Sequence, residues 1–130
     1  MLFERAVTNG VLVEVESFYV PEHSDRGTNH FFFSYKIKIR NSGQRPVQLM
    51  SRHWVITDGQ GRMEEVKGPG VIGQQPCLEP GEAFEYESFC PLPTPTGMMR
   101  GSYQMVCLQS GEQFNAEIPQ FFLVEPNSYH

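Results

Sequence analysis

The sequence predicts an all-β fold, an immunoglobulin- or fibronectin-type-III-like β-sandwich of about seven or eight antiparallel strands. Three observations lead to this class. Short stretches alternate apolar and polar residues with the period of a half-buried strand. Turn-forming residues (Gly 12, Pro 10) interrupt these stretches at roughly ten-residue spacing. Strand-favouring aromatic residues are plentiful (Phe 10, Tyr 5), and no stretch has a convincing helical period.

The first two expected strands follow from clear alternation. Segment 11–20 predicts a half-buried strand with an apolar face. That face consists of Val11, Val13 and Val15. The polar, turn-rich segment 21–29 is expected to be a mobile surface loop. Segment 31–40 then alternates strictly and predicts a second strand. Its inward row consists of Phe33, Tyr35, Ile37 and Ile39.

A β-hairpin is predicted from 47–57 and 63–67. The turn contains Asp58-Gly59, and this dipeptide supplies the positive-φ position that tight hairpin turns require. If Gly59 and Gln60 form a two-residue loop, Trp54 lies opposite Glu65 and Ile56 opposite Met63. A different loop length would shift this register.

The remaining strands lie between proline and glycine punctuation. Segment 84–88 predicts a strand with an acidic outward row, which we expect to be solvated and to blunt edge pairing. This row consists of Glu82, Glu85 and Glu87. The proline-rich segment 91–97 is expected to be a loop. Further strands are expected at 98–108, 113–118 and 121–124, the last two separated or bent by Pro119.

The length fits a single domain over residues 1–130. A chain of 130 residues can bury a core without metals or disulfide staples. We expect 1–9 and 125–130 to be flexible ends. The immunoglobulin mark of paired cysteines around a strand tryptophan is absent, so a fibronectin-type-III-like arrangement is favoured.

Charge and cysteine content exclude several function classes. A net charge of −5 argues against a nucleic-acid surface, because neutralising phosphates needs clustered Lys and Arg. The three cysteines show no Cys-x-x-Cys spacing, so neither a disulfide scaffold nor a zinc site is expected. No basic region precedes an apolar run at the N-terminus, and no segment is long enough to cross a bilayer. We expect a cytoplasmic protein with no cofactor and with neither nucleic acid nor membrane as partner.

Several segments together carry a recognisable pattern. They are Phe-Ser-Tyr-Lys-Ile-Lys-Ile-Arg-Asn (33–41), Val-Gln-Leu-Met-Ser-Arg-His-Trp-Val-Ile-Thr-Asp (47–58), Glu-Glu-Val-Lys-Gly-Pro-Gly-Val-Ile-Gly-Gln-Gln-Pro (64–76), Leu-Glu-Pro-Gly-Glu (78–82), Tyr-Glu-Ser (86–88) and Ile-Pro-Gln-Phe (118–121). With them the sequence resembles the ApaG family across nearly the whole chain. The resemblance implies a fibronectin-like sandwich, in agreement with the strand count.

What the resemblance implies about function is limited. ApaG proteins are small bacterial proteins largely without an assigned activity. Their genes tend to lie near those for a diadenosine-tetraphosphate hydrolase and a ribosomal RNA adenine methyltransferase, and they have been linked to cobalt and magnesium efflux. Similar domains in eukaryotic F-box proteins and in a polymerase-delta-interacting protein imply a partner-binding role. Nothing in the resemblance implies catalysis.

The glycine-rich segment Gly68–Gly73 has the letters of a dinucleotide-binding fingerprint. That fingerprint works when the glycines join a strand to a helix, whereas Pro76 and Pro80 follow here without a helical period. The favoured interpretation is a connector whose glycines take backbone angles closed to other residues. The alternative is pyrophosphate or nucleotide binding by backbone amides, with nearby cations around the anion. The residues of this candidate anion site are Arg52, Arg62, Lys67, Gly68, Gly70 and Gly73.

Aromatic residues give a candidate interaction surface. Trp54 is favoured to pack in or at the edge of the core, with Arg52 stacking on it or pairing with Glu65; the alternative is a binding platform of Trp54 and Arg52. Consecutive phenylalanines at 31–33 and 121–122 must place one ring of each run away from the main core. Such rings form either an end cap or self-association seam, as in a homodimer, or a partner-binding patch. The candidate interaction residues are Trp54, Phe31, Phe32 and Phe122.

Metal and catalytic sites are not expected. His53 with Glu64 and Glu65 could hold a divalent ion, but no spaced second histidine accompanies it, and the resemblance commonly places tyrosine at this position. There is no Gly-x-Ser-x-Gly elbow. Ser51, His53 and Asp58 lie too close along one strand to converge as a triad.

The sequence therefore predicts a non-catalytic binding module that serves a protein partner. The alternative function is binding of a small phosphate-containing molecule at Gly68–Gly73, linked to nucleotide or Co²⁺/Mg²⁺ homeostasis.

Overall fold

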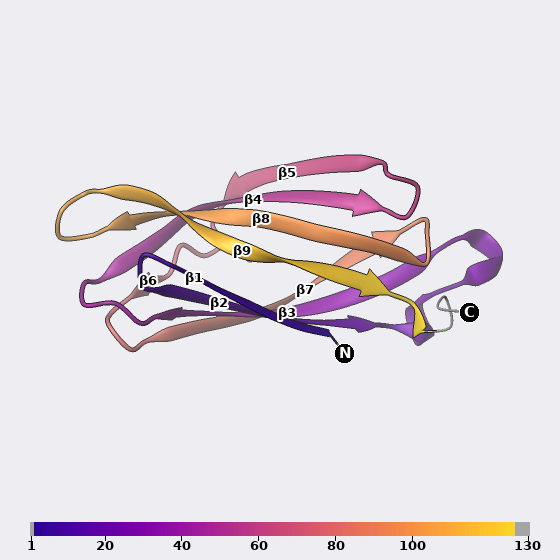
Figure 1. The fold of residues 1–130 in the computed structure, drawn as a ribbon, viewed down its shortest axis with the longest axis horizontal. Coiled ribbons are helices and arrows are strands. Elements are labelled where there is room, and N and C mark those ends of the chain that lie inside the picture. The colour runs from indigo at the N-terminus through magenta and orange to yellow at the C-terminus, as the bar shows by residue number, and fades with distance from the viewer. Residues whose placement is uncertain (1, 127–130) are drawn as a thin grey trace.

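The protein is a sandwich of two antiparallel sheets, and the computed structural model describes residues 2–126 (Figure 1). Sheet A has the strand order β1 (Leu2–Thr8), β2 (Val11–Tyr19), β3 (Phe31–Asn41), β7 (Ala83–Leu92). Sheet B has the order β5 (Met63–Pro69), β4 (Val47–Asp58), β8 (Thr96–Cys107), β9 (Gln113–Val124), and β6 (Cys77–Leu78) also pairs with β4. Within the described residues, no α-helix is present and no helix could span a membrane. The predicted all-β sandwich is confirmed.

Alternating side chains fill the space between the sheets, as expected. The predicted inward rows of β2 and β3 are buried, with Val13, Phe33 and Ile39 at 0% exposure. Sheet B contributes Leu49, Tyr103 and Phe121, which are also at 0%. Apolar burial of this kind is the main favourable term in folding.

One side of the sandwich is closed by contacts between the sheets. Strand β9 packs against β1 and β2. Ser17 Oγ of β2 donates a hydrogen bond to the Phe122 carbonyl (2.9 Å), and Glu117 N of β9 donates to Thr8 Oγ1 of β1 (3.1 Å). On the opposite side, β5 and β7 are the outer strands of their sheets.

The predicted flexible N-terminal end is wrong. Residues Leu2–Thr8 form β1, which pairs with β2 from Leu2↔Ser17 to Thr8↔Val11. At the other end, Glu125 is only 2% exposed and forms an ion pair with Arg26. The rest of the predicted flexible C-terminal end, 127–130, lies outside the described residues.

The hairpin of β4 and β5 is confirmed, but its predicted register is wrong by one residue. Trp54 lies opposite Val66 rather than Glu65, and Ile56 opposite Glu64. Asp58 N donates to Arg62 O (2.9 Å), and the positive φ falls at Gly61 (86°), so the loop spans 59–61. A type I turn followed by a left-handed glycine is the usual three-residue hairpin loop.

Two bulges modify sheet B. The pairing of β4 with β8 shifts between Leu49 and Ser51, which leaves Met50 as an extra residue. The pairing of β8 with β9 shifts next to Pro119, but β9 continues through this proline. Of the two expected outcomes, Pro119 therefore bends the strand and does not divide it. The predicted loop at 91–97 is shorter than expected, because β7 extends to Leu92 and β8 begins at Thr96. Pro91 is tolerated in β7 because this is an edge strand.

Candidate functional site

The glycine-rich segment 68–73 connects β5 to β6 and contains a tight turn. Val71 N donates to Gln74 O (2.8 Å), and Gln74 N donates to Val71 O (2.9 Å). The two residues between them, Ile72 (φ 47°) and Gly73 (φ 73°), both have positive φ, as a type I′ turn requires. No helix begins here, so the segment lacks the context of a dinucleotide-binding loop.

Two of the backbone donors that an anion would need, Gly70 N and Val71 N, are engaged within the protein. Gly70 N donates to Met50 O (2.9 Å), at the β4 bulge, and Val71 N is used in the turn. Gln75 Nε2 donates to the same Met50 carbonyl (2.9 Å). Val71 is 1% exposed and forms part of the core. These contacts fit the favoured interpretation of the segment as a connector.

The predicted cations divide into two places. The Arg52 guanidinium donates through Nη1 to Pro69 O and Gly70 O (both 3.0 Å) and lies against Gly68, where an added Cβ would meet it at 3.0 Å. Lys67 lies exposed opposite His53. Arg62 follows the hairpin loop before β5 begins, at the far end of that strand, so the predicted cluster of three cations does not form.

The structure also separates the four predicted interaction residues. Trp54 is 3% exposed and packs between Tyr35 (ring centroids 5.5 Å apart) and Phe121 (6.0 Å). Phe31 is 5% exposed. Assigning these two to a binding surface is therefore wrong, because strand alternation turns both rings inward. The favoured core position of Trp54 is confirmed.

Phe32 and Phe122 do lie on the outside, but on different sheets. Phe32, on sheet A, stacks on the exposed Phe89 of β7 (5.4 Å), and His23 contacts the same ring edge-on (5.5 Å). Phe122, on β9 of sheet B, is 48% exposed.

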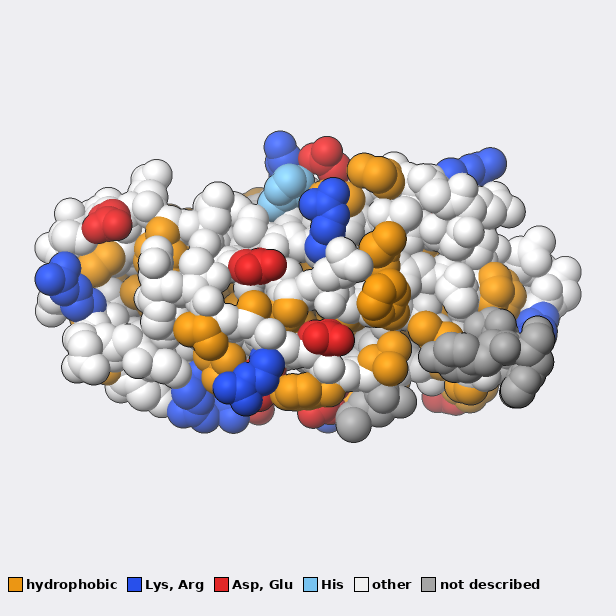
Figure 2. Space-filling view, in the orientation of Figure 1, with side chains coloured by type: hydrophobic (Ala, Val, Ile, Leu, Met, Phe, Trp, Pro, Cys, Tyr) orange, Lys and Arg blue, Asp and Glu red, His pale blue; other side chains and the backbone are white. Residues whose placement is uncertain are grey.

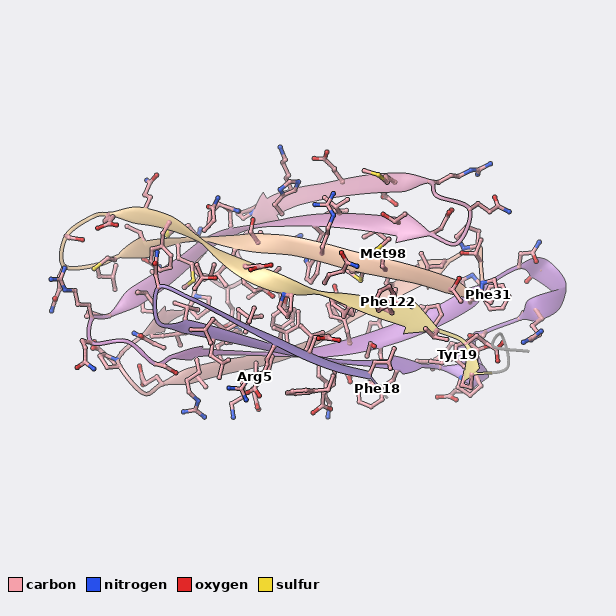
Figure 3. All side chains as sticks on the ribbon, viewed as in Figure 1. Arg5, Phe18, Tyr19, Phe31, Met98 and Phe122 are labelled. Carbon is pink, nitrogen blue, oxygen red and sulfur yellow. The ribbon has the colours of Figure 1, made fainter. Side chains whose placement is uncertain are left out.

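An exposed apolar row crosses the outer face of sheet B around Phe122. Strand pairing sets Met63 opposite Thr57, Thr57 opposite Met98, and Met98 opposite Phe122. Met63 is 63% exposed and Met98 is half-buried. Figure 3 shows Met98 and Phe122 side by side on β8 and β9, and Figure 2 shows hydrophobic side chains running across the strands here. We call Met63, Thr57, Met98 and Phe122 the outer apolar row.

Three tyrosines lie between the sheets, and the positive charge of Arg52 affects the pKa of each. The hydroxyls of Tyr86 and Tyr103 share a hydrogen bond. Burial raises the pKa of Tyr35, Tyr86 and Tyr103, and the Arg52 charge partly opposes this rise. The hydroxyls therefore stay protonated near neutral pH, and Arg52 has a structural role towards the core and the glycine-rich segment.

The metal hypothesis at His53 finds only one partner. His53 Nε2 lies 3.0 Å from Glu65 Oε2 on the outer face. Glu64, the residue before Glu65 in β5, points to the opposite face because side chains alternate along a strand. Within residues 2–126, no three His, Cys, Asp or Glu side chains gather as metal ligands.

The comparisons with known proteins decide the family. The ApaG domain profile matches residues 21–107. The chain belongs to the ApaG family. An ApaG protein of Methylorubrum extorquens is 52% identical over 123 residues, covering 95% of this chain and 94% of its own. An ApaG protein of Bdellovibrio bacteriovorus is 54% identical over 112 residues, covering 86% and 87%. The solved structure of a protein described as ApaA from Bordetella pertussis has a TM-score of 0.87 at 51% identity, covering 89% of this chain and 94% of that one.

Sequence reasoning missed two members of the outer apolar row in this ApaG domain. Met63 and Met98 stand in strands whose local alternation gives no reason to single them out. The signal that could have found them is strand pairing, because Met98 lies directly opposite Phe122, and Met63 is brought near Met98 through Thr57 of β4.

The cysteines of this ApaG domain are free, and their environments differ. Burial raises the pKa of Cys90 to about 12. Hydrogen bonds from the Ser110 side chain and backbone lower the pKa of Cys107 to about 7, with a smaller contribution from Arg45.

Proposed function

We propose that this ApaG domain is a non-catalytic module that binds a protein partner through the outer apolar row. The observation that supports this is a cross-strand row with three apolar side chains, Met63 at 63% exposure, the half-buried Met98, and Phe122 at 48%, in which Thr57 of β4 lies between the two methionines. Exposed contiguous apolar area usually marks an interaction surface. Methionine also adapts its shape to a partner, which suits it to such surfaces.

The outer apolar row lies at one end of this sheet face, and a row of polar residues crosses the face further along. In this polar row, His53 lies opposite Lys67 on one side and Ser102 on the other, and Ser102 lies opposite Glu117. Next to the outer apolar row, a shallow apolar groove continues along Thr96 and Val124. A partner with an apolar ridge rimmed by polar groups would match this arrangement.

Small-anion binding is the second candidate, and one observation favours it. Arg52, His53 and Lys67 line a shared shallow depression beside Gly68 and Gln104. Such a site would take pyrophosphate or a nucleotide, in line with a role in nucleotide or Co²⁺/Mg²⁺ homeostasis. The engaged amides of Gly70 and Val71 leave the side chains to provide most of the binding.

The compartment is part of the same proposal. Three unpaired cysteines, of which Cys77 is exposed, fit a reducing environment. We place the domain in the cytoplasm on this ground.

Capture followed by reconstitution tests the protein-binding proposal. The domain is immobilised as wild type, as the double variant Met98→Thr/Phe122→Thr, and as the control Phe89→Thr, which removes an equally exposed aromatic from sheet A. Proteins retained from host lysate are quantified, purified and titrated calorimetrically. We expect a partner that binds the wild type and the control with similar affinity. Its affinity for the double variant should be at least about tenfold lower. Equal binding to all three forms, or no partner for the wild type, would overturn the proposal.

Amide chemical shifts separate the two candidates. The ¹⁵N-labelled protein is titrated with pyrophosphate, ATP, Mg²⁺ and Co²⁺. Saturable shifts confined to Arg52, Lys67 and residues 68–73 would favour anion binding. Unchanged shifts at millimolar ligand would exclude it.

A further inference from the structure

Strand β5 is an uncovered edge of sheet B. It pairs with β4 on one side, and no described strand pairs with its other side (Figure 1). Unpaired backbone groups along such an edge are a template for another strand. The sheet edges at β1 and β9 lie against each other across the sandwich, so they are less accessible.

The hydrogen bonds at both ends of β5 show which of its backbone groups are free. Arg62 O accepts from Asp58 N, and Gly70 N donates to Met50 O, both towards β4. Because antiparallel pairing alternates, the even-numbered residues of β5 bond to β4 and the odd-numbered ones point away. The outward-pointing N–H and C=O groups therefore belong to Met63, Glu65 and Lys67, whereas Pro69 has no N–H and its carbonyl already accepts from Arg52.

These groups match a second copy of the same strand in one register. Two antiparallel copies of β5 with Val66 facing Val66 place Glu65 directly opposite Lys67, twice by symmetry. In this register Glu65 and Lys67 are hydrogen-bonded pairs, because both have outward backbone groups. The neighbouring registers, centred on Glu65 or on Lys67, set Glu65 opposite Glu65 or Lys67 opposite Lys67. Such like-charge pairs are unfavourable.

We propose that β5 pairs with β5 of a second copy of this chain about a twofold axis at Val66. The two copies of sheet B then form one continuous sheet, with charge complementarity between Glu65 and Lys67 fixing the register. Both side chains are exposed on the outer face. Glu65 keeps one carboxylate oxygen for His53, and the second is available for the partner's lysine.

The other accessible edge does not offer this match. Asn41 N donates to Glu82 O, so the odd-numbered residues of β7 point away from β3. These residues include Glu85 and Glu87. If β7 paired with a second copy of itself around these residues, glutamate would lie opposite glutamate. Acidic edges of this kind prevent pairing. The charge pattern therefore selects β5.

Charge swapping tests the register. Sedimentation velocity is measured from about 10 μM to about 1 mM, because a single paired strand buries little area and gives a weak dimer. The wild type is expected to dimerise as its concentration rises. Lys67→Glu and Glu65→Lys should each weaken the dimer about tenfold, since each creates two like-charge pairs. The double variant E65K/K67E should restore it.

Control variants separate this edge from the rest of the surface. Glu87→Lys makes the same charge change on β7, and Met98→Thr/Phe122→Thr alters the outer apolar row; both should dimerise like the wild type. Melting temperatures establish that each variant folds. A wild type that stays monomeric throughout, a Lys67→Glu variant that still dimerises normally, or a double variant without recovery would overturn the proposal.

Discussion

The glycine-rich segment 68–73 resembles a binding motif in sequence but has few free binding groups, whereas the outer apolar row has no sequence motif but is exposed. The segment has the letters of a nucleotide-binding motif, yet the amides of Gly70 and Val71 and the Arg52 guanidinium bind groups within the protein. The outer apolar row has no motif, yet Met63 and Phe122 remain exposed. A candidate site is therefore better judged by which groups are left free than by the letters that surround it.

The contrast is sharpest between Trp54 and Phe122, both of which are among the candidate interaction residues. Trp54→Ala should lower the free energy of unfolding by about 3–5 kcal/mol, because it empties space beside Tyr35 and Phe121. Phe122→Ala should cost about 1 kcal/mol, since the ring is half exposed. Urea denaturation measures both, and equal losses would contradict the separation of core and surface.

Within the glycine-rich segment, Gly70 should matter more than Gly73. An added Cβ at Gly70 would lie 2.1 Å from Gln74 O, whereas at Gly73 it meets nothing within 4 Å. Both residues have positive φ (59° and 73°). Gly73→Ala should cost about 1 kcal/mol for its backbone angle alone, and Gly70→Ala about 2 kcal/mol more. Denaturant titration of the two variants gives their free energies of unfolding, and the difference between them measures the clash of the added Cβ with Gln74 O. Similar losses for both variants would show that the turn can shift to relieve this clash.

Ile72 should be replaceable with a gain in stability. It is 60% exposed and has φ 47°, which is unfavourable for a β-branched residue. Ile72→Asn creates the Asn-Gly pair that type I′ turns prefer and should raise stability by about 1 kcal/mol. A melting curve for this variant gives the answer. A loss of stability would indicate that the isoleucine makes contacts beyond the turn.

The smallest effect concerns Cys107. With a pKa of about 7 against an ordinary value of 9, its thiol is partly ionised near neutral pH, whereas Cys90 has a pKa of about 12. Because Cys107 is only 9% exposed, iodoacetamide should alkylate it slowly, with a midpoint near pH 7, and leave Cys90 unmodified in the native state. Because the unfolded thiol holds its proton more tightly, stability should rise between pH 7 and 9 and fall as pH drops through 7. Mass spectrometry of peptides after timed labelling reports both cysteines. Alkylation of Cys107 only above pH 8.5 would show that Ser110 does not lower its pKa.

Much of the fold was predictable because β2, β3 and β8 each bury one face. Strand β1 was not, because Leu2–Thr8 is exposed on most positions and gives no alternating signal. The hairpin register depended on the left-handed residue being Gly61 rather than Gly59, and both glycines suit a turn.

The candidate site was predictable only in part. Alternation correctly predicts that one ring of 121–122 faces outward, and Phe122 is that ring. It could not place Met98 beside it, since that neighbourhood depends on the pairing of β8 with β9. The fate of Arg52 depended on carbonyl groups some seventeen residues further along the chain, at Pro69 and Gly70.

The extra residue Met50 decides which way half of β4 faces. Before it, odd-numbered residues such as Leu49 point into the core; after it, even-numbered ones such as Trp54 do. Deleting this one methionine would reverse the parity, so that either Trp54 turns to solvent and Thr57 inward or the strand slides along its neighbours. The outer face of sheet B thus owes its composition to a single inserted amino acid in β4, which lies about 23 Å from Thr57 at a rise of ~3.3 Å per residue.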